Sequence, residues 1–294
     1  MNYKPLLILL VFNPFFFAQA KTTALQNTGV NVQPRVYLQG ALHGLLPAAT
    51  LMRDNLRALG LLPSTEPYTS LGYHFWNHGI DIGGGETLAN PNVLQVTGSN
   101  AIVDWVIVEL RSTSFLDSIK WSRAALVQRD GDVVDVDGIS PVNFPNANPG
   151  EYRVMVRHRN HLGIMSDSDI ALSTTPVTVD FTDIDTQLAC PYGMTTIGNK
   201  RALWGGDLNM DGRLIYQGPG NDILKLFTTV LYDSANTSLI TSFVSTGYLQ
   251  ADANMDGKAI YQGPNSDRTF VFQFIGPAYN FNFGNNYVVL ECVP

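Results

Sequence analysis

The last third of the chain contains one pattern twice, as Asp207-Leu-Asn-Met-Asp-Gly212 and as Asp252-Ala-Asn-Met-Asp-Gly257. Two residues separate each glycine from the string Ile-Tyr-Gln-Gly-Pro. An aspartate follows the proline at the same distance in both copies, as Asp222 and Asp267. The copies are 45 residues apart. A repeat of this length predicts two supersecondary units that bury their apolar faces against each other.

The repeated pattern is typical of the first half of an EF-hand loop. Ca²⁺ prefers six to eight oxygen ligands, and such a loop supplies them from positions 1, 3, 5 and 7, with a glycine at position 6 for the sharp turn. Position 12 should carry a bidentate acid, but it is Gly218 or Gly263 here, so we expect the aspartate at position 16 to close the shell. The first predicted site comprises Asp207, Asn209, Asp211, the carbonyl of Arg213, and Asp222. The second comprises Asp252, Asn254, Asp256, the carbonyl of Lys258, and Asp267.

The alternative to two calcium sites is a pair of Asx-rich turns without metal. Against it, three acids that converge on one point repel one another unless a cation is present. The acids are used as ligands in this reading, and no nucleophile–base pair lies near them in the sequence. We therefore expect calcium as cofactor at two sites, with a structural role in the C-terminal repeats.

The region before the repeats is rich in predicted strands. Residues 102–110 are almost continuously apolar and β-branched, as expected of a strand that is covered on both sides. Asp130-Gly131 predicts the tight turn of a hairpin over residues 124–137. One helix is expected over residues 51–59, capped by Thr50, and short helices are expected over residues 222–231 and 267–275.

These patterns predict a mainly β fold with several domains. The expected order is a signal peptide over residues 1–20, a linker over 21–30, a β-sandwich-like domain over 31–184, and a domain of two calcium loops with short helices over 185–294. The segment of residues 68–91, which contains Tyr73, Phe75 and Trp76, is rich in glycine and asparagine and is expected to form a long surface loop.

The N-terminus predicts export, and the charge excludes one class of partner. Lys4, a short apolar run and Ala18-Gln-Ala20 form a secretory signal with cleavage expected after Ala20, and the run is too short to span a bilayer. We therefore expect a secreted or cell-surface protein without a transmembrane span in the mature chain. The formal charge of −7 and the absence of a Lys/Arg-rich run exclude a nucleic-acid surface.

The chain has two cysteines, Cys190 and Cys292, which bracket the repeats. An even number of cysteines in an exported chain predicts one disulfide, and two unpaired buried thiols are the alternative.

Several strings resemble known families. The paired loops resemble dockerin type I repeats, which implies calcium binding and a cohesin-like partner; loop positions 9 and 12 depart from that pattern. The wider chain resembles haemagglutinin-like (adhesin-like) surface proteins of Bacteroidetes, in Tyr37-Leu-Gln-Gly40, residues 103–111, Gln128-Arg-Asp-Gly-Asp132 and residues 156–163. This resemblance implies an exported, non-catalytic surface protein with a possible host glycan or glycoprotein as partner.

Other arrangements are weaker candidates. His74 with His78, and His158 with His161, have zinc-like spacings but lack a third ligand, so surface or turn histidines are expected. Asp104 and Glu109 lie five residues apart on one predicted strand, face opposite sides, and should pair with Arg111 and Arg157 rather than act as a glycosidase pair. Two alternative functions remain open: an assembly module of a polysaccharide-degrading system, and a glycoside hydrolase or its accessory protein.

Overall fold

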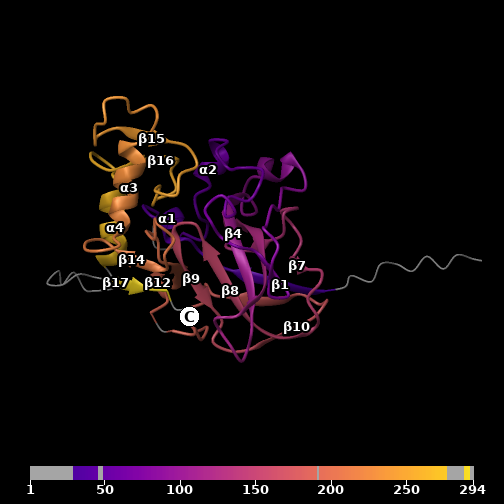
Figure 1. The fold of residues 1–294 in the computed structure, drawn as a ribbon. Coiled ribbons are helices and arrows are strands. Elements are labelled where there is room, and N and C mark those ends of the chain that lie inside the picture. Colours follow the sequence, from indigo (N-terminus) through magenta and orange to yellow (C-terminus); the bar gives the residue numbers. More distant parts are fainter. Residues whose placement is uncertain (1–28, 46–48, 191, 277–287, 292–294) are drawn as a thin grey trace, which may run out of the picture.

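The computed structural model describes residues 29–45, 49–190, 192–276 and 288–291. The expected signal peptide and Cys292 lie outside these residues. The protein is mainly β, as predicted, and Figure 1 shows the sheets on one side and the helices α3 and α4 on the other. The helices are α1 Gln39–Leu42, α2 Asn55–Ala58, α3 Asp222–Leu231 and α4 Asp267–Ile275, with a 3₁₀ turn over Pro91–Gln95.

The larger sheet has the strand order β10-β8-β4-β5-β2-β3, with β6 beside β5 and β9 beside β8. Its strands are β2 Trp76–Asn77, β3 Ile80–Asp81, β4 Ile102–Arg111, β5 Ile119–Gln128, β6 Val133–Val134, β8 Gly150–His158, β9 His161–Met165 and β10 Ile170–Leu172. All ten residues of β4 are buried, which confirms the prediction of a strand that is covered on both faces. The hairpin at Asp130-Gly131 is also confirmed, since Leu126 pairs with Val134.

A second sheet has the order β11-β1-β7 and consists of β1 Val30–Arg35, β7 Val142–Phe144 and β11 Val177–Asp180. Both sheets contribute apolar side chains to one core, among them Val32, Trp105 and Val156. A hairpin of β12 Met194–Ile197 and β13 Lys200–Leu203 adds Met194 and Leu203 to the same core. The apolar side chains up to Leu203 therefore pack mainly with the sheets rather than with the repeats.

The two repeats share a second core. It contains pairs of residues at equivalent positions, such as Leu214 with Ala259 and Leu226 with Val271. Each loop leads into a short strand, β14 Arg213–Ile215 or β16 Lys258–Ile260, and then into α3 or α4. β14 pairs with β17 Val288–Leu290, and β16 pairs with β15 Val244–Thr246. The mutual packing expected of the repeats is thus present.

The helices differ in part from the predictions. α3 and α4 have the expected bounds, and Asn221 and Ser266 cap them by accepting hydrogen bonds from Leu224 and Thr269. The helix expected over residues 51–59 is a single turn, α2, because the chain before it is occupied by other contacts: Met52 and Arg53 donate backbone hydrogen bonds to Arg129 and Ala41.

The face of α3 that packs inward also differs. The apolar spacing of α3 puts Leu224, Phe227 and Leu231 on one face, but Leu224 is 58 % exposed and the buried apolar residues are Ile223, Leu226 and Val230. None of the described helices is long and apolar enough to cross a membrane.

Candidate calcium loops and the buried turn beside them

The first loop is organised by its carboxylates. The side chain of Asp207 accepts hydrogen bonds from the backbone N–H groups of Asp211 and Gly212, both at 3.1 Å. Asp222, the first residue of α3, accepts from Leu208 and Ile215, both at 2.7 Å. The acid at position 16 therefore accepts hydrogen bonds from loop positions 2 and 9, as expected if it belongs to the same site as Asp207.

The second loop has the same contacts. Asp252 accepts from Asp256 at 3.1 Å and from Gly257 at 2.7 Å, and Asp267 accepts from Ala253 and Ile260, both at 2.8 Å. In addition, Asn209 and Asn254 each accept from the N–H at position 5 at 3.2 Å. Two sequences with the same side-chain-to-backbone contacts are two copies of one local structure.

The backbone repeats as well. Both glycines at position 6, Gly212 and Gly257, have positive φ angles of 75° and 85°, as the predicted sharp turn requires. The methionines at position 4, Met210 and Met255, have φ of 60° and 58°, a conformation that is uncommon for a residue with a side chain. The loop structure thus holds the same strained residue in both copies.

Aromatic residues join the two repeats reciprocally. Tyr216 packs against Phe272 of α4 with ring centroids 5.2 Å apart, and Phe227 of α3 packs against Tyr261 at 5.1 Å. These two contacts join equivalent positions in opposite directions, which is the signature of a pseudo-twofold relation. The loops are therefore placed at equivalent positions of one paired unit.

The acids of the first loop repel one another. Burial, followed by the charge of Asp211, raises the pKa of Asp207 to about 7. Burial also raises the pKa of Asp222 to about 8, with the charges of Asp207 and Asp211 adding to it. The negative electrostatic potential at this loop therefore favours either protonation of the carboxylates or binding of a cation.

The acids of the second loop are raised in the same way. Burial raises the pKa of Asp252 to about 7, although the nearby guanidinium of Arg159 opposes this. Burial and the charge of Asp252 raise the pKa of Asp267 well above its ordinary value. Two sites with the same carboxyl chemistry thus differ in their neighbouring cations, since Arg159 and Arg53 both lie near the acids of the second loop.

The oxygens of the loops fit a calcium ion by their chemistry. Within the described ranges, no three His, Cys, Asp or Glu side chains gather closely enough to hold a metal ion. A shell in either loop therefore draws on the amide oxygen of Asn209 or Asn254 and on backbone carbonyls, a mixture that Ca²⁺ accepts. A carboxylate that accepts an N–H bond keeps free lone pairs, so the contacts described above do not block coordination.

Backbone carbonyls of the second loop accept hydrogen bonds from side chains of the sheet region. Arg53 donates to the carbonyl of Asn254 at 2.9 Å, and the amide of Asn160 donates to the carbonyl of Asp252 at 2.7 Å. A Cβ at Gly40 would lie 2.3 Å from the carbonyl of Ala253, so this position requires glycine. In agreement, Asn254 is 5 % exposed, whereas the first loop has an exposed Asp211.

The turn between β8 and β9 forms the other side of this contact. The histidines at this turn, His158 and His161, were expected to be surface or turn histidines; they are turn residues and not surface ones, because they are almost completely buried under the second loop. Gly40 donates to Nε2 of His161 at 3.0 Å, so the neutral ring carries its proton on Nδ1. That proton faces Asn160 at 2.8 Å and Nδ1 of His158 at 2.9 Å.

His158 continues this chain of hydrogen bonds to Asp104, whose Oδ2 lies 3.1 Å from Nε2 of the ring. The same oxygen accepts from Arg159 at 3.0 Å, and Tyr248 donates to the other carboxyl oxygen at 2.6 Å. Arg159 also donates to the carbonyl of Leu249 and lies 4.4 Å above the ring of Tyr248. The side chains of Asp104, His158, Arg159 and Tyr248 thus join the sheets to the segment before the second loop.

Asp104 and Glu109 do not face one another, as the sequence predicts. Glu109 is fully buried and pairs with Arg111 at 2.6 Å and with Arg157 at 2.9 Å, and Arg157 in turn pairs with Glu291 at 2.6 Å. The arginine partners proposed for the strand acids are thus confirmed for Glu109. This pair of carboxyls has no geometry for glycoside hydrolysis.

The remaining candidates are distributed over the surface. His74 contacts Asp81 at 2.6 Å, and His78 lies beside Trp121 with ring centroids 5.6 Å apart. The predicted loop over residues 68–91 is mostly exposed but contains the hairpin β2–β3, and its Phe75 is buried. The pairing of Cys190 with Cys292 stays a prediction because Cys292 lies outside the described residues.

Comparison of the chain with models of protein families, with curated proteins and with solved structures gave no match.

Proposed function

We propose that this chain is a secreted or cell-surface, calcium-binding protein of the adhesin (haemagglutinin-like) type that binds a partner without catalysis. In this proposal a β-sandwich presents the binding surface, and two dockerin-like calcium loops stabilise the C-terminal region. The observation that supports it best is the repetition of one set of carboxylate and amide contacts at two loops whose acids repel one another.

Calcium has a direct structural role in this proposal. When bound, it neutralises the clustered carboxylates of each loop, and it thereby stabilises the folded state by an amount that rises with its concentration. At ten times Kd, each site contributes about 1.4 kcal/mol. Asp222 and Asp267 link each ion to the first turn of the following helix, so the ion stabilises the junction of loop and helix.

The test is a calcium titration of the full chain by calorimetry. We expect two sites, and we expect the double variant Asp207→Ala with Asp252→Ala to take up no calcium and to show no calcium-dependent melting temperature. The matched control is Asp183→Ala with Asp233→Ala, which removes two acids outside the loops. If the wild-type protein takes up no calcium, the proposal fails.

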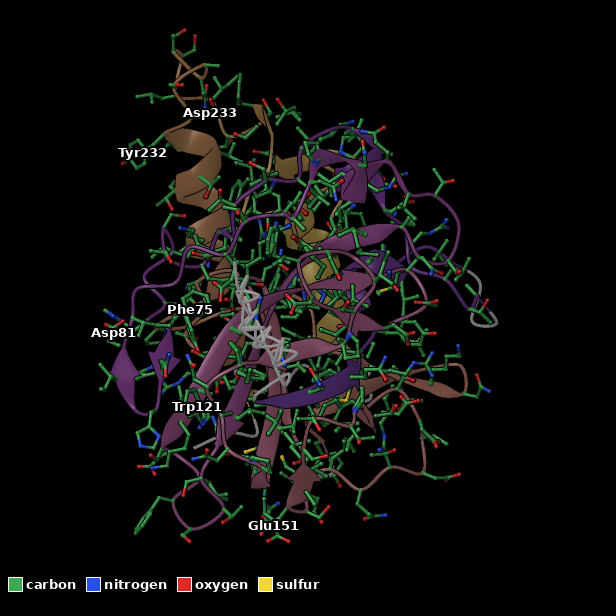
Figure 2. The ribbon with its side chains drawn as sticks, turned by 90° about the vertical axis from the view of Figure 1, so that its right-hand side faces the viewer. Phe75, Asp81, Trp121, Glu151, Tyr232 and Asp233 are labelled. Carbon is green, nitrogen blue, oxygen red and sulfur yellow. The ribbon has the colours of Figure 1, made fainter. Side chains whose placement is uncertain are left out.

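A second candidate function, a dockerin-type assembly module with a cohesin-like partner, has one observation in its favour. Leu224 and Tyr232 on and after α3 are 58 % and 71 % exposed, and Leu239 is exposed nearby in sequence. Figure 2 shows Tyr232 at the end of the helix, directed away from the molecule. Tight, calcium-dependent capture of a cohesin domain that is lost in Leu224→Asp would favour this function over the first.

A further inference from the structure

A pocket of about 260 Å³ opens beside the edge hairpin β2–β3. Trp76, Trp121 and Phe144 supply aromatic walls, and Glu86, Arg123 and Asn77 supply polar groups. None of the lining residues belongs to the calcium repeats. Figure 2 shows Trp121 on the same side of the molecule as Asp81 of β3. The pocket is therefore a feature of the β region alone.

The walls of the pocket are held in place by backbone contacts. The N–H of Trp76 donates to the hydroxyl of Ser122 at 2.8 Å, and Asn77 pairs with Trp121 across β2 and β5. Ile82, at the rim, donates to the carbonyl of Phe75 at 2.8 Å. These contacts fix the ring positions before any ligand binds, which lowers the entropic cost of binding.

Two charged side chains of the pocket have a buried polar atom without a partner. They are Oε2 of Glu86 and Nε of Arg123. The other nitrogens of Arg123 are occupied, since they donate to the carbonyl of Asn143 at 2.5 Å and to Asp135 at 2.8 Å. A buried polar atom without a partner is costly. Both side chains line the pocket, but these two atoms are closed off from solvent, so a ligand can satisfy them only when Glu86 and Arg123 rotate toward it.

The two atoms need opposite partners. The carboxyl oxygen of Glu86 needs a donor, and the N–H of Arg123 needs an acceptor. A hydroxyl group can do both, and neighbouring hydroxyls on one ring can serve both side chains at once. The opposite charges of Glu86 and Arg123 disfavour a strongly anionic or cationic ligand, because either one would be repelled by one of them.

We propose that this pocket binds one pyranose ring of a neutral saccharide, with its C–H face against the aromatic walls and its hydroxyls toward Glu86 and Arg123. The half-buried ring of Trp76 supplies the accessible apolar surface, whereas Trp121 is only 6 % exposed and shapes the wall. The volume is below the range of pockets for drug-sized ligands, so it suits a single ring rather than a longer chain.

This inference rests on the proposed binding role but not on calcium, because no lining residue lies in the loops. The test titrates the full chain by calorimetry with D-glucose, D-galactose, D-mannose and N-acetyl-D-glucosamine, each in calcium and in chelator. We expect at least one sugar to bind at millimolar concentrations under both conditions. If calcium uptake fails while a sugar binds, the calcium proposal falls and this inference stands.

Two variants locate the site. Trp76→Ala should weaken sugar binding by about tenfold or more, because it removes the accessible aromatic surface. Glu86→Gln keeps the shape of the side chain and should weaken binding several-fold. The matched control is Phe115→Ala, an aromatic residue that is 69 % exposed outside the pocket, which should leave binding unchanged.

Three results would overturn the inference. The first is that none of the four sugars binds to the folded protein. The second is that a sugar binds equally well to wild type, Trp76→Ala and Glu86→Gln. The third is that inorganic phosphate, included as an anionic probe, binds in the pocket and is lost in Trp76→Ala while the sugars do not bind. Circular dichroism of each variant establishes that it is folded.

Discussion

The ring of Tyr216, which follows the first repeated loop, packs edge-on against Phe272 of α4 in the second repeat, with centroids 5.2 Å apart. The equivalent pair, Phe227 with Tyr261, repeats the contact at 5.1 Å. Each repeat therefore supplies one tyrosine and one phenylalanine to the junction, and neither repeat can complete these contacts alone.

We expect this contact to show as coupling between mutations. Tyr216→Leu and Phe272→Leu should each destabilise the repeats, and the double variant should lose about 1 kcal/mol less than the sum of the single losses. Chemical denaturation at a fixed calcium concentration measures the free energy of unfolding of the wild type, the two single variants and the double variant. As a control, Tyr216→Leu combined with Phe115→Leu should be additive, and additivity in the first cycle would contradict a direct contact.

The two loops should bind calcium unequally. Arg53 and Arg159 place positive charge near Asp252, whereas no cation is among the leading influences on the pKa of Asp207 or Asp222. Calorimetry of Asp252→Ala, which leaves the first loop, should therefore give about tenfold tighter binding than Asp207→Ala, which leaves the second loop. Arg53→Gln, added to Asp207→Ala, should tighten the second site; equal affinities of the two loops would contradict this argument.

The ion pair of Arg157 with Glu291 fastens the C-terminal strand β17 to the sheets. Both oxygens of Glu291 lie within 2.7 Å of Arg157, and one also accepts from the N–H of Gly163 at 2.7 Å. Glu291→Gln should destabilise the protein by about 1–3 kcal/mol, since Arg157 keeps Glu109 as a partner. Glu109→Gln should cost more, about 3–5 kcal/mol, because the buried Arg111 loses its carboxylate and the half-buried Arg157 loses one of its two. Denaturant titration of both variants checks which of them loses more free energy of unfolding.

Acid should weaken the contact between the sheets and the second loop. Burial lowers the pKa of His158, and burial together with His158 and Arg159 lowers the pKa of His161 well below 6.5. Both rings are neutral in the folded protein and gain protons when it unfolds. Their contribution to stability is therefore complete above pH 6.5 and is lost as the pH falls below it, by up to about 1.4 kcal/mol per ring and pH unit.

The measurement is the free energy of unfolding between pH 7.5 and 5.5 at saturating calcium, which keeps the loop carboxylates ionised. The NMR signals of His161 should stay constant over this range in the folded protein, and the pKa of His158 should lie below its ordinary value. His74→Asn, which replaces an exposed histidine, should leave the dependence of the unfolding free energy on pH unchanged. If that dependence persists after both buried histidines are replaced by asparagine, it arises from other groups.

Local patterns predicted the parts of this fold that depend on nearby residues. The repeated loops, the glycines at position 6, the bounds of α3 and α4, and the fully covered strand β4 all follow from short-range spacing. The arginine partners of Glu109 were also predictable, because adjacent strands bring such residues together.

Contacts between distant segments were not predictable in the same way. The burial of His158 and His161 results from coverage by the second loop, more than 80 residues further along the chain. α3 has apolar residues on more than one face, and its packing in the shared core of the repeats buries Ile223, Leu226 and Val230 and leaves Leu224 exposed. The pocket at Trp76 depends on Phe144 from another sheet, and no spacing in the sequence connects the two.

The pairing of β14 with β17 also has a consequence for the order in which the molecule assembles. The strand β16 of the second loop pairs with β15, which precedes it in the chain, so this half can close as soon as it has been synthesised. The strand β14 that leaves the first loop must wait for residues 288–290, with its edge open to other chains in the meantime. The first repeat is thus the later one to finish, and it is the repeat that is exposed to misassembly during synthesis.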